Sequence, residues 1–289
     1  MLLCDIGGED IARYQAERLD RGASPKTVNL EVGTLRAILR KNRMWANLQP
    51  DVRLLRVSEG VGRAISGQEE SRLLEACRAT RSRSLYPVVV LALNTCMRYS
   101  ELRLLQWGQA DFTARTVTVG KAKTESGTGR LIPLNNRALA VLKFWAELFP
   151  AREPAHYVFP FEKYGGRGKD DHFGFTEACV HGTDPTKPIG RWKEAWEAAK
   201  KRAKVQCRFH DLRHTGCTRM LEAGVPFSVV ATIMGWSASS TVRMAKRYGH
   251  IGQAAQRQAV AALSGADFEG DGAQNWAQSQ KVAAGQLAN

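Results

Sequence analysis

Three short helices, separated by glycine and proline, are predicted one after another in the last third of the chain, and they constrain how this region can fold. Gly224 is predicted to end the first helix in a left-handed backbone conformation, and Pro226 to open the second. Gly235 is predicted to end the second helix, and Ser239 or Ser240 to cap the third. The predicted helices are His210 to Glu222, Pro226 to Met234, and the capping serine to about Tyr248.

The basic composition narrows the class of partner. The chain has 289 residues, of which 42 are Lys or Arg and 28 are Asp or Glu, for a formal net charge of +14. Such an excess favours a polyanion, which can be DNA, RNA or an anionic membrane surface. The basic residues are spread along the chain, which indicates that a folded surface, rather than a basic tail, grips the partner.

The sequence lacks the marks of a membrane-spanning or secreted protein. No apolar run is long enough to span a bilayer, and the start of the chain lacks the pattern of a secretory signal. Cysteines without a Cys-x-x-Cys pair are typical of free thiols in a reducing cytoplasm. They are Cys4, Cys77, Cys96, Cys179, Cys207 and Cys217. We therefore expect a cytoplasmic protein with no membrane partner.

The chain is predicted to contain two domains, because a charged stretch that ends in Glu59-Gly60-Val61-Gly62 indicates a linker. A chain with 44% hydrophobic residues can bury a good core, in one large or two modest domains. Helices are predicted over 9–19 and 26–43, and Ser24 and Pro25 open the second. The basic face of that helix is either solvated surface or a phosphate contact. The predicted parts are a small helical unit at 1–57, a linker at 58–62, a second domain at 63–263, and a disordered tail at 264–289.

The second domain is predicted to be mainly α-helical with a small antiparallel β-sheet. Ser66 has the pattern of a cap for a helix that ends at Arg78. Residues 85–95 form a nearly unbroken apolar run whose length fits a buried helix. Strands at 115–119 and 130–134 enclose a basic, turn-rich tip and predict a hairpin. The other predicted elements are helices at 136–149 and 190–205, and a surface insertion without periodicity at 161–188.

Residues from three distant segments can together bind and attack a phosphate. His210 and Arg213 are three residues apart in a predicted helix, so they share a face. An arginine fork matches two phosphate oxygens, and Arg98, at a junction between two predicted helices, supplies a second fork. Two arginines can compensate the charge of phosphoryl transfer without a metal ion. Tyr248 carries a phenol, with a reference pKa of about 10, that can attack phosphorus as a covalent nucleophile.

The remaining candidates can move protons or form the wall of a site. Lys123, at the hairpin tip, can donate a proton to the departing oxygen, and His210 can accept and return one. Trp236 offers one indole N–H and a flat apolar face. Each of these residues alone has a plainer interpretation, as a packed aromatic, a histidine at a helix start or a solvated lysine. Their combination favours a phosphate site.

The same residues lie in boxes that resemble those of the tyrosine recombinases of the phage-integrase type. Met97-Arg98-Tyr99-Ser100-Glu101-Leu102 resembles the family's first arginine box, in which Glu101 is a supporting residue, and Lys123 resembles its catalytic lysine. The other boxes are His210-Asp211-Leu212-Arg213-His214-Thr215, Met234-Gly235-Trp236-Ser237, where the family usually has Leu-Gly-His-Ser, and Arg247-Tyr248-Gly249-His250. The gap from Trp236 to Tyr248 is longer than in many members, but Tyr248 is the only tyrosine after Tyr164.

The resemblance implies a mainly α fold with a small antiparallel sheet, in a two-domain clamp around double-stranded DNA. Residues 1–57 resemble a core-binding domain of the SAM-like type, shorter than in the family, so we expect a truncated first domain. The implied activity is site-specific recombination through a 3′-phosphotyrosine, with chemistry like that of type IB topoisomerases and without cofactor, metal or ATP. A homotetramer on two duplexes, DNA-bending accessory proteins and a nucleoid-associated bacterial or phage-encoded protein are also implied.

Two other interpretations stay open. A metal hydrolase is suggested by His210-Asp211-Leu212-Arg213-His214, which imitates His-Glu-x-x-His, but Arg213 shares that helix face. The additional candidates His172, Cys179 and His181 have weak ligand spacing. A non-catalytic DNA-binding protein derived from an integrase would need only the basic helices. Such a protein gives no reason for Arg98, Lys123, His210, Arg213 and Tyr248 to occur together.

Overall fold

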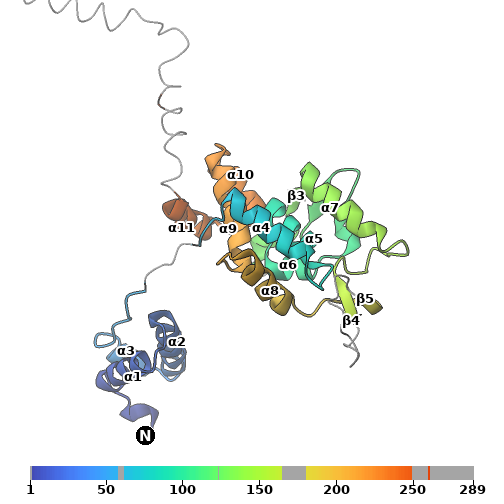
Figure 1. Ribbon diagram of the computed structural model, residues 1–289. Coiled ribbons are helices and arrows are strands. Elements are labelled where there is room, and N and C mark those ends of the chain that lie inside the picture. Colours follow the sequence, from blue (N-terminus) through green and yellow to red (C-terminus); the bar gives the residue numbers. More distant parts are fainter. Residues whose placement is uncertain (1, 58–61, 123, 165–179, 249–259, 261–289) are drawn as a thin grey trace, which may run out of the picture. The chain divides into compact units, whose positions relative to one another are not determined.

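In the computed structural model, the described residues are 2–57, 62–122, 124–164, 180–248 and 260. The chain divides into two compact units, Met1–Val61 and Gly62–Asn289, which we call the amino-terminal and the carboxyl-terminal unit (Figure 1). The predicted domain boundaries stay predictions, and the predicted tail at 264–289 lies outside the described residues. No helix among the described residues combines the length and the apolar character that a bilayer crossing requires.

The described part of the amino-terminal unit is helical. Its elements are the 3-10 helix η1 (Leu3–Asp5) and the helices α1 (Gly8–Asp20), α2 (Pro25–Lys41) and α3 (Trp45–Leu48). Helix α2 begins as predicted, because the Ser24 hydroxyl accepts a hydrogen bond from the Thr27 N–H at 3.2 Å. The small core consists of Ile11, Val28, Val32, Leu39 and Trp45. Asn29 exchanges two hydrogen bonds with the backbone of Leu55, which fixes the chain after α3 to α2.

The carboxyl-terminal unit contains most of the helices. They are α4 (Gly67–Arg78), α5 (Leu85–Thr95), α6 (Tyr99–Arg103), α7 (Asn136–Glu147), α8 (Lys193–Ala203), α9 (Phe209–Glu222), α10 (Phe227–Met234) and α11 (Ala238–Tyr248), with the 3-10 helices η2 (Trp107–Gln109) and η3 (Glu125–Gly127). The predicted cap of α4 is confirmed, since Ser66 and Glu69 each accept a hydrogen bond from the other's backbone N–H.

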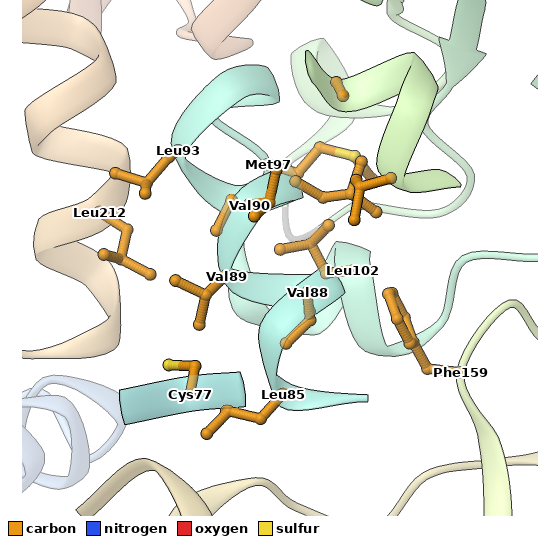
Figure 2. Close-up of a cluster of buried hydrophobic side chains, with 14 of the residues drawn as sticks. Cys77, Leu85, Val88, Val89, Val90, Leu93, Met97, Leu102, Phe159 and Leu212 are labelled. Atoms are coloured by element: carbon orange, nitrogen blue, oxygen red, sulfur yellow. The ribbon is translucent and has the colours of Figure 1, made fainter. Parts of the chain in front are cut away.

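Helix α5 forms the centre of the core of this unit. Its apolar sequence is explained by its neighbours, because α4, α7 and α9 all pack against it. Figure 2 shows α5 side chains meeting Cys77 of α4, Leu102 of α6 and Leu212 of α9, together with Phe159, which directly precedes β4. The prediction of a buried helix over residues 85–95 is therefore confirmed.

Two small antiparallel sheets accompany the helices in the described part of the unit. The first has the order β1 (Ala110–Asp111), β2 (Thr116–Thr118) and β3 (Leu131–Pro133), so the predicted hairpin is confirmed and a short third strand joins it. The second pairs β4 (Pro160–Tyr164) with β5 (Val180–Pro188). Each end of the predicted surface insertion at 161–188 therefore forms a strand that was not predicted from the sequence, which lacks periodicity there. Residues 165–179 lie outside the described residues.

Helices α9, α10 and α11 follow one another as the glycine and proline pattern predicts. Gly224 and Gly235 have φ angles of +78° and +59°, so both adopt the left-handed conformation expected after a helix. The predicted cap of the third helix is wrong by a few residues. Helix α11 begins earlier than expected, because Ser237 accepts the hydrogen bond from the Ser240 N–H at 3.3 Å.

Candidate active site

Arg98 is positioned by the junction between two helices. Cys96 follows the last residue of α5 and has a left-handed φ of 54°, and Arg98 precedes the first residue of α6. This turn aims the Arg98 side chain at Glu101, whose carboxylate accepts a hydrogen bond from the Nη1 atom at 2.7 Å. The same carboxylate accepts the Arg98 backbone N–H at 2.8 Å. The guanidinium is therefore held through its Nη1 atom, and the side chain as a whole stays half-buried.

Arg213 lies between the carboxyl-terminal ends of two helices. Its Nη1 donates a hydrogen bond to the Cys96 carbonyl at the end of α5, and its Nη2 donates to the Met234 carbonyl at the end of α10. Both partners are neutral carbonyls at the negative ends of helix dipoles, so they orient the cation without cancelling its charge. Arg213 is only 4% exposed. Burial and the nearby Arg98 cation lower the pKa of Arg213 to about 10, which leaves it charged at neutral pH.

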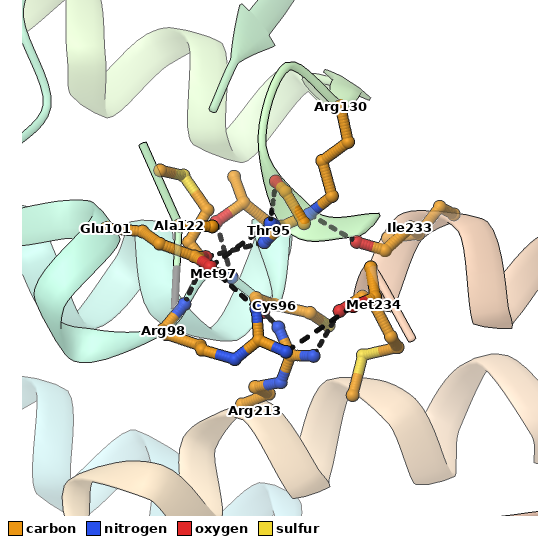
Figure 3. Close-up of polar contacts among 12 residues, drawn as sticks. Thr95, Cys96, Met97, Arg98, Glu101, Ala122, Arg130, Arg213, Ile233 and Met234 are labelled. Atoms are coloured by element: carbon orange, nitrogen blue, oxygen red, sulfur yellow. Dashed lines mark hydrogen bonds and ion pairs between the residues drawn. The ribbon is translucent and has the colours of Figure 1, made fainter. Parts of the chain in front are cut away.

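The last turn of α10 holds arginines from three parts of the chain (Figure 3). Ile233 accepts a hydrogen bond from the Nε of Arg130 at 3.1 Å. Met234 accepts a hydrogen bond from Arg213, and Gly235 accepts one from the Nη2 of Arg98 at 3.5 Å. Three consecutive carbonyls thereby join the β-hairpin, the α5–α6 junction and α9 to one helix end.

Glu101 connects two of these arginines. Besides Arg98, its carboxylate binds Arg130, with distances of 3.1 and 2.5 Å to the two guanidinium nitrogens. Burial by itself raises the pKa of Glu101, but hydrogen bonds and charge from Arg130 and Arg98 outweigh it and lower the pKa to about 2. The carboxylate is therefore ionised at neutral pH. One carboxylate among three guanidinium groups leaves the cluster strongly positive.

The Tyr248 ring, at the end of α11, packs against side chains of α9, of α10 and of the segment that follows α10. It stacks on Trp236, with ring centroids 6.2 Å apart and planes at 20°. Trp236 in turn lies on Phe227, with centroids 5.7 Å apart. The Tyr248 hydroxyl is 2.5 Å from the Nδ1 atom of His214. Tyr248 is 5% exposed and belongs to a small buried cluster with Cys217 and Met234.

One pocket brings these residues together. It has a volume of about 200 Å³ and is lined by Arg98, His210, Arg213, His214, Met234, Trp236, Ser240, Arg243, Met244 and Tyr248. The structure thus places at one site five of the residues that the sequence analysis selected separately. Lys123, the sixth, lies outside the described residues. Glu101 does not line the pocket, but it binds Arg98, which does.

His210 occupies the exposed side of the pocket. Its ring packs edge to face on the ring of His214, with centroids 5.1 Å apart. Desolvation, followed by the charges of Arg213 and Arg208, lowers the pKa of His210. The imidazole is therefore neutral at neutral pH and can donate or accept a hydrogen bond at the pocket wall.

Three residues of this region were not selected from the sequence as parts of the site. Arg130 directly precedes β3, and its partner Glu101 is 29 residues earlier in the chain, so no local pattern connects them. Arg243 reaches the pocket from α11. His214 follows His210 by one helical turn, and this spacing was considered only as an imitation of a metal motif. Its contact with Tyr248 depends on the packing of α11 on α9.

The sequence is similar to integrases and DNA recombinases. The model of the Phage integrase family matches residues 63–254. The chain is 28% identical to the integrase of Salmonella phage P22 over 238 residues, which are 79% of this chain and 55% of that protein. It is 29% identical to the shufflon-specific DNA recombinase of Escherichia coli over 260 residues, 86% of this chain and 58% of that protein. The chain spans little more than half the length of these two relatives.

Solved structures share the fold. The Tn1549 transposon integrase, residues 82–397, in complex with circular intermediate DNA has a TM-score of 0.64 at 21% identity, covering 88% of this chain and 85% of that one. A λ integrase tetramer bound to a Holliday junction gives 0.59 at 17% identity, covering 83% and 64%. The predicted fold, mainly α with a small antiparallel sheet, is confirmed. Because the family model covers most of the carboxyl-terminal unit, the chain belongs to the phage integrase family of tyrosine recombinases.

Proposed function

We propose that this protein is a site-specific DNA recombinase that cuts and rejoins strands through a 3′-phosphotyrosine on Tyr248. One observation carries the proposal. Two guanidinium groups and one phenol, from three distant segments, line a single pocket of about 200 Å³. A phosphodiester is the group that suits this set, because arginine forks match its oxygens and a phenol can attack its phosphorus.

The arginines bind the scissile phosphate in this proposal. Arg98 and Arg213 hold the non-bridging oxygens, and their charge compensates the negative charge that collects there during transfer. Glu101 and the carbonyls at the end of α10 keep both side chains in place before DNA arrives. Preorganised charge of this kind avoids the cost of reorganising the site at the moment of reaction.

Strand cutting proceeds by exchange of one phosphodiester for another. The Tyr248 oxygen attacks phosphorus, the bond to the 5′-oxygen breaks, and Lys123 protonates that leaving oxygen. A 5′-hydroxyl from a partner strand then reverses the step and releases Tyr248. His210 and Trp236 support the phosphate from the pocket wall. Because the covalent link conserves the bond energy, the reaction requires neither ATP nor a metal ion.

The partners follow from the family and from the charge. Double-stranded DNA suits a net charge of +14, and residues 1–57 are proposed to bind it as a core-binding domain. Assembly as a homotetramer on two duplexes is supported by the λ integrase tetramer on a Holliday junction. We also propose that DNA-bending accessory proteins assist the reaction. The protein is proposed to act on nucleoid DNA in a bacterial cytoplasm.

A trapping experiment tests this function. The wild-type protein is mixed with attachment-site DNA from its own genomic context that carries a nick close to the scissile phosphate, so that the short cut strand diffuses away. We expect a covalent protein–DNA adduct that resists denaturation, that forms in the presence of a strong chelator, and that is absent for Tyr248→Phe.

The alternative, a non-catalytic DNA-binding protein, gives a different result. Wild type and Tyr248→Phe would then bind the DNA equally and neither would form an adduct. A chelator that abolishes the adduct would point instead to metal chemistry. No group of three or more His, Cys, Asp or Glu side chains suited to a metal ion occurs within the part of the chain that the structure describes.

A further inference from the structure

We propose that His214 is the base that takes the phenolic proton from Tyr248 during strand cutting and returns it during rejoining. This inference rests on the proposed function and adds to it the group that activates the nucleophile. His210 was the proton acceptor predicted from the sequence. In the structure, the histidine that contacts the Tyr248 hydroxyl lies one turn later in α9.

The contact between His214 and Tyr248 has the geometry of a proton-transfer pair. The Nδ1 atom of His214 lies 2.5 Å from the Tyr248 hydroxyl oxygen. Neutral histidine has one ring nitrogen that accepts a hydrogen bond, and a tyrosine hydroxyl can donate to it. His214 is 9% exposed, so bulk water does not readily compete for this contact. A base must lie within hydrogen-bonding reach of the proton it takes, and His214 meets that condition.

The opposite edge of the His214 ring is covered by the chain segment before α4. A Cβ atom at Gly62 would lie 2.1 Å from the Cδ2 and 2.3 Å from the Nε2 of His214, so only glycine lets the backbone approach this closely. The Ile65 N–H donates to the Thr215 hydroxyl at 3.0 Å, which attaches the same segment to α9. The imidazole is thus confined between Gly62 and Tyr248, with Nδ1 directed at the hydroxyl.

Trp236 fixes the other partner of the pair. Its indole stacks on the Tyr248 ring with planes at 20°, so the phenol cannot easily turn away from His214. The pair also lies in the phosphate pocket, since His214 and Tyr248 line it together with Arg98 and Arg213. The structure therefore joins base, nucleophile and phosphate clamp at one place.

The proposed step conserves atoms and charge. As the Tyr248 oxygen bonds to phosphorus, its O–H bond breaks and the proton moves to Nδ1 of His214, which becomes an imidazolium. The bond from phosphorus to the 5′-oxygen breaks, and Lys123 protonates that oxygen. In rejoining, the incoming 5′-hydroxyl loses its proton to Lys123, and His214 returns its proton to the departing Tyr248. A phenol with a pKa of about 10 benefits from such a base at neutral pH.

The experiment uses the full-length His214→Asn protein. An asparagine amide can occupy the place of Nδ1 and contact Tyr248, but it cannot take a proton. We expect single-turnover cleavage of the nicked substrate to fall about 100-fold or more, with DNA affinity and melting temperature close to wild type. If His214→Asn does not fold, His214→Gln serves for the same measurement.

A more acidic phenol at position 248 distinguishes a role of His214 in proton transfer from a role in packing alone. When Tyr248 is replaced by 3,5-difluorotyrosine, the phenol ionises without help, so cleavage by the His214→Asn protein should recover to within about tenfold of wild type. The matched control is Lys123→Ala, whose defect lies at the leaving group. It should be rescued by a sulfur at the 5′-bridging position and not by the fluorinated tyrosine. The His214→Asn defect should show the opposite pattern.

Two results would overturn the assignment. His214→Asn cleaving at the wild-type rate would mean that the contact carries no proton. A slow His214→Asn protein that difluorotyrosine fails to rescue would mean that His214 only packs against Tyr248. Failure of the proposed function itself is distinguishable, because then the wild-type protein forms no adduct, or Tyr248→Phe forms one.

Discussion

Arg98 and Arg213 are anchored to adjacent backbone carbonyls, since Gly235 accepts a hydrogen bond from the first and Met234 from the second. The end of α10 therefore sets the spacing of two guanidinium groups that come from distant parts of the chain. These carbonyls are neutral, so the two contacts do not cancel the charge of either arginine. Arg98 also pairs with the Glu101 carboxylate, which Arg130 shares. The geometry of the helix end is thus a condition for the proposed phosphate clamp.

Gly235→Ala tests this dependence on the helix end. Gly235 has a φ of +59°, and a Cβ there would lie 2.9 Å from the Arg130 Cδ and 3.0 Å from the Gly127 Cα. We expect a loss of about 2 to 3 kcal/mol in the free energy of unfolding, from backbone strain together with the clash.

Gly224→Ala is the matched control for that substitution. Gly224 has a φ of +78°, but a Cβ atom at this position would meet nothing within 4 Å. Strain alone should cost about 1 kcal/mol. Urea unfolding of the two variants measures the difference, and strand-cleavage rates should fall far more for Gly235→Ala. Equal effects of the two variants would show that contacts at the end of α10 do not matter.

Glu101→Gln tests the buried ion pairs through pH. The pKa of Glu101 is lowered from 4.5 to about 2, so its ionised form stabilises the folded protein above pH 4.5, and this contribution declines as the pH falls towards 2. The contribution amounts to about 3 kcal/mol. Because glutamine does not titrate, the stability difference between wild type and variant should be largest at pH 7 and should shrink by more than half at pH 3. Urea unfolding across this range measures it, and a constant difference would contradict the lowered pKa.

Two substitutions separate the contribution of the Trp236 ring, which stacks on Tyr248, from that of its indole N–H group. Trp236→Phe keeps a ring on Tyr248 and loses the donor, which should slow cleavage about tenfold if one hydrogen bond to a charged phosphate disappears. Trp236→Ala also loses the stacking that orients Tyr248, so at least a further tenfold loss is expected. Single-turnover cleavage compares the two. Identical rates for Phe and Ala would mean that the stack contributes nothing to the reaction.

Lys123→Ala tests the leaving-group assignment. Removing one phosphate-facing lysine changes the salt dependence of DNA binding by only about one unit, so affinity should change little. Cleavage should slow by about 100-fold or more, because the 5′-oxygen loses its proton donor. Binding isotherms at several salt concentrations and cleavage rates on the same DNA provide the measurement. An equal loss of affinity and of cleavage rate would mean that Lys123 contributes only to electrostatic binding of DNA.

Much of the fold was predictable because its signals are local. Ser24 and Ser66 mark helix starts, and Gly224 and Gly235 mark helix ends, since caps and left-handed residues depend on a few neighbours in sequence. The errors lie where pairing is distant. Strand β4 meets β5 across residues that carry no alternating pattern, and the ladder between them cannot be read from either segment alone.

The site was predictable to the extent that each residue lies in a recognisable box. Arg98, Arg213, Trp236 and Tyr248 were selected in this way, and the structure places them around one pocket. Arg130 and His214 were not, because their roles arise from tertiary contacts: Arg130 meets Glu101 and the end of α10, and His214 meets Tyr248. A histidine one turn after another on the same helix face was the available signal for His214.

The most direct test of the central claim removes charge from the scissile phosphate. Arg213→Ala should be almost inactive on ordinary DNA, because a non-bridging oxygen then lacks its cation. On a substrate with a methylphosphonate at the scissile position, one charge is absent and less compensation is needed, so Arg213→Ala should regain adduct formation while Tyr248→Phe stays inactive. Equal impairment of Arg213→Ala on both substrates would contradict the account that this arginine and Tyr248 act on the same phosphorus.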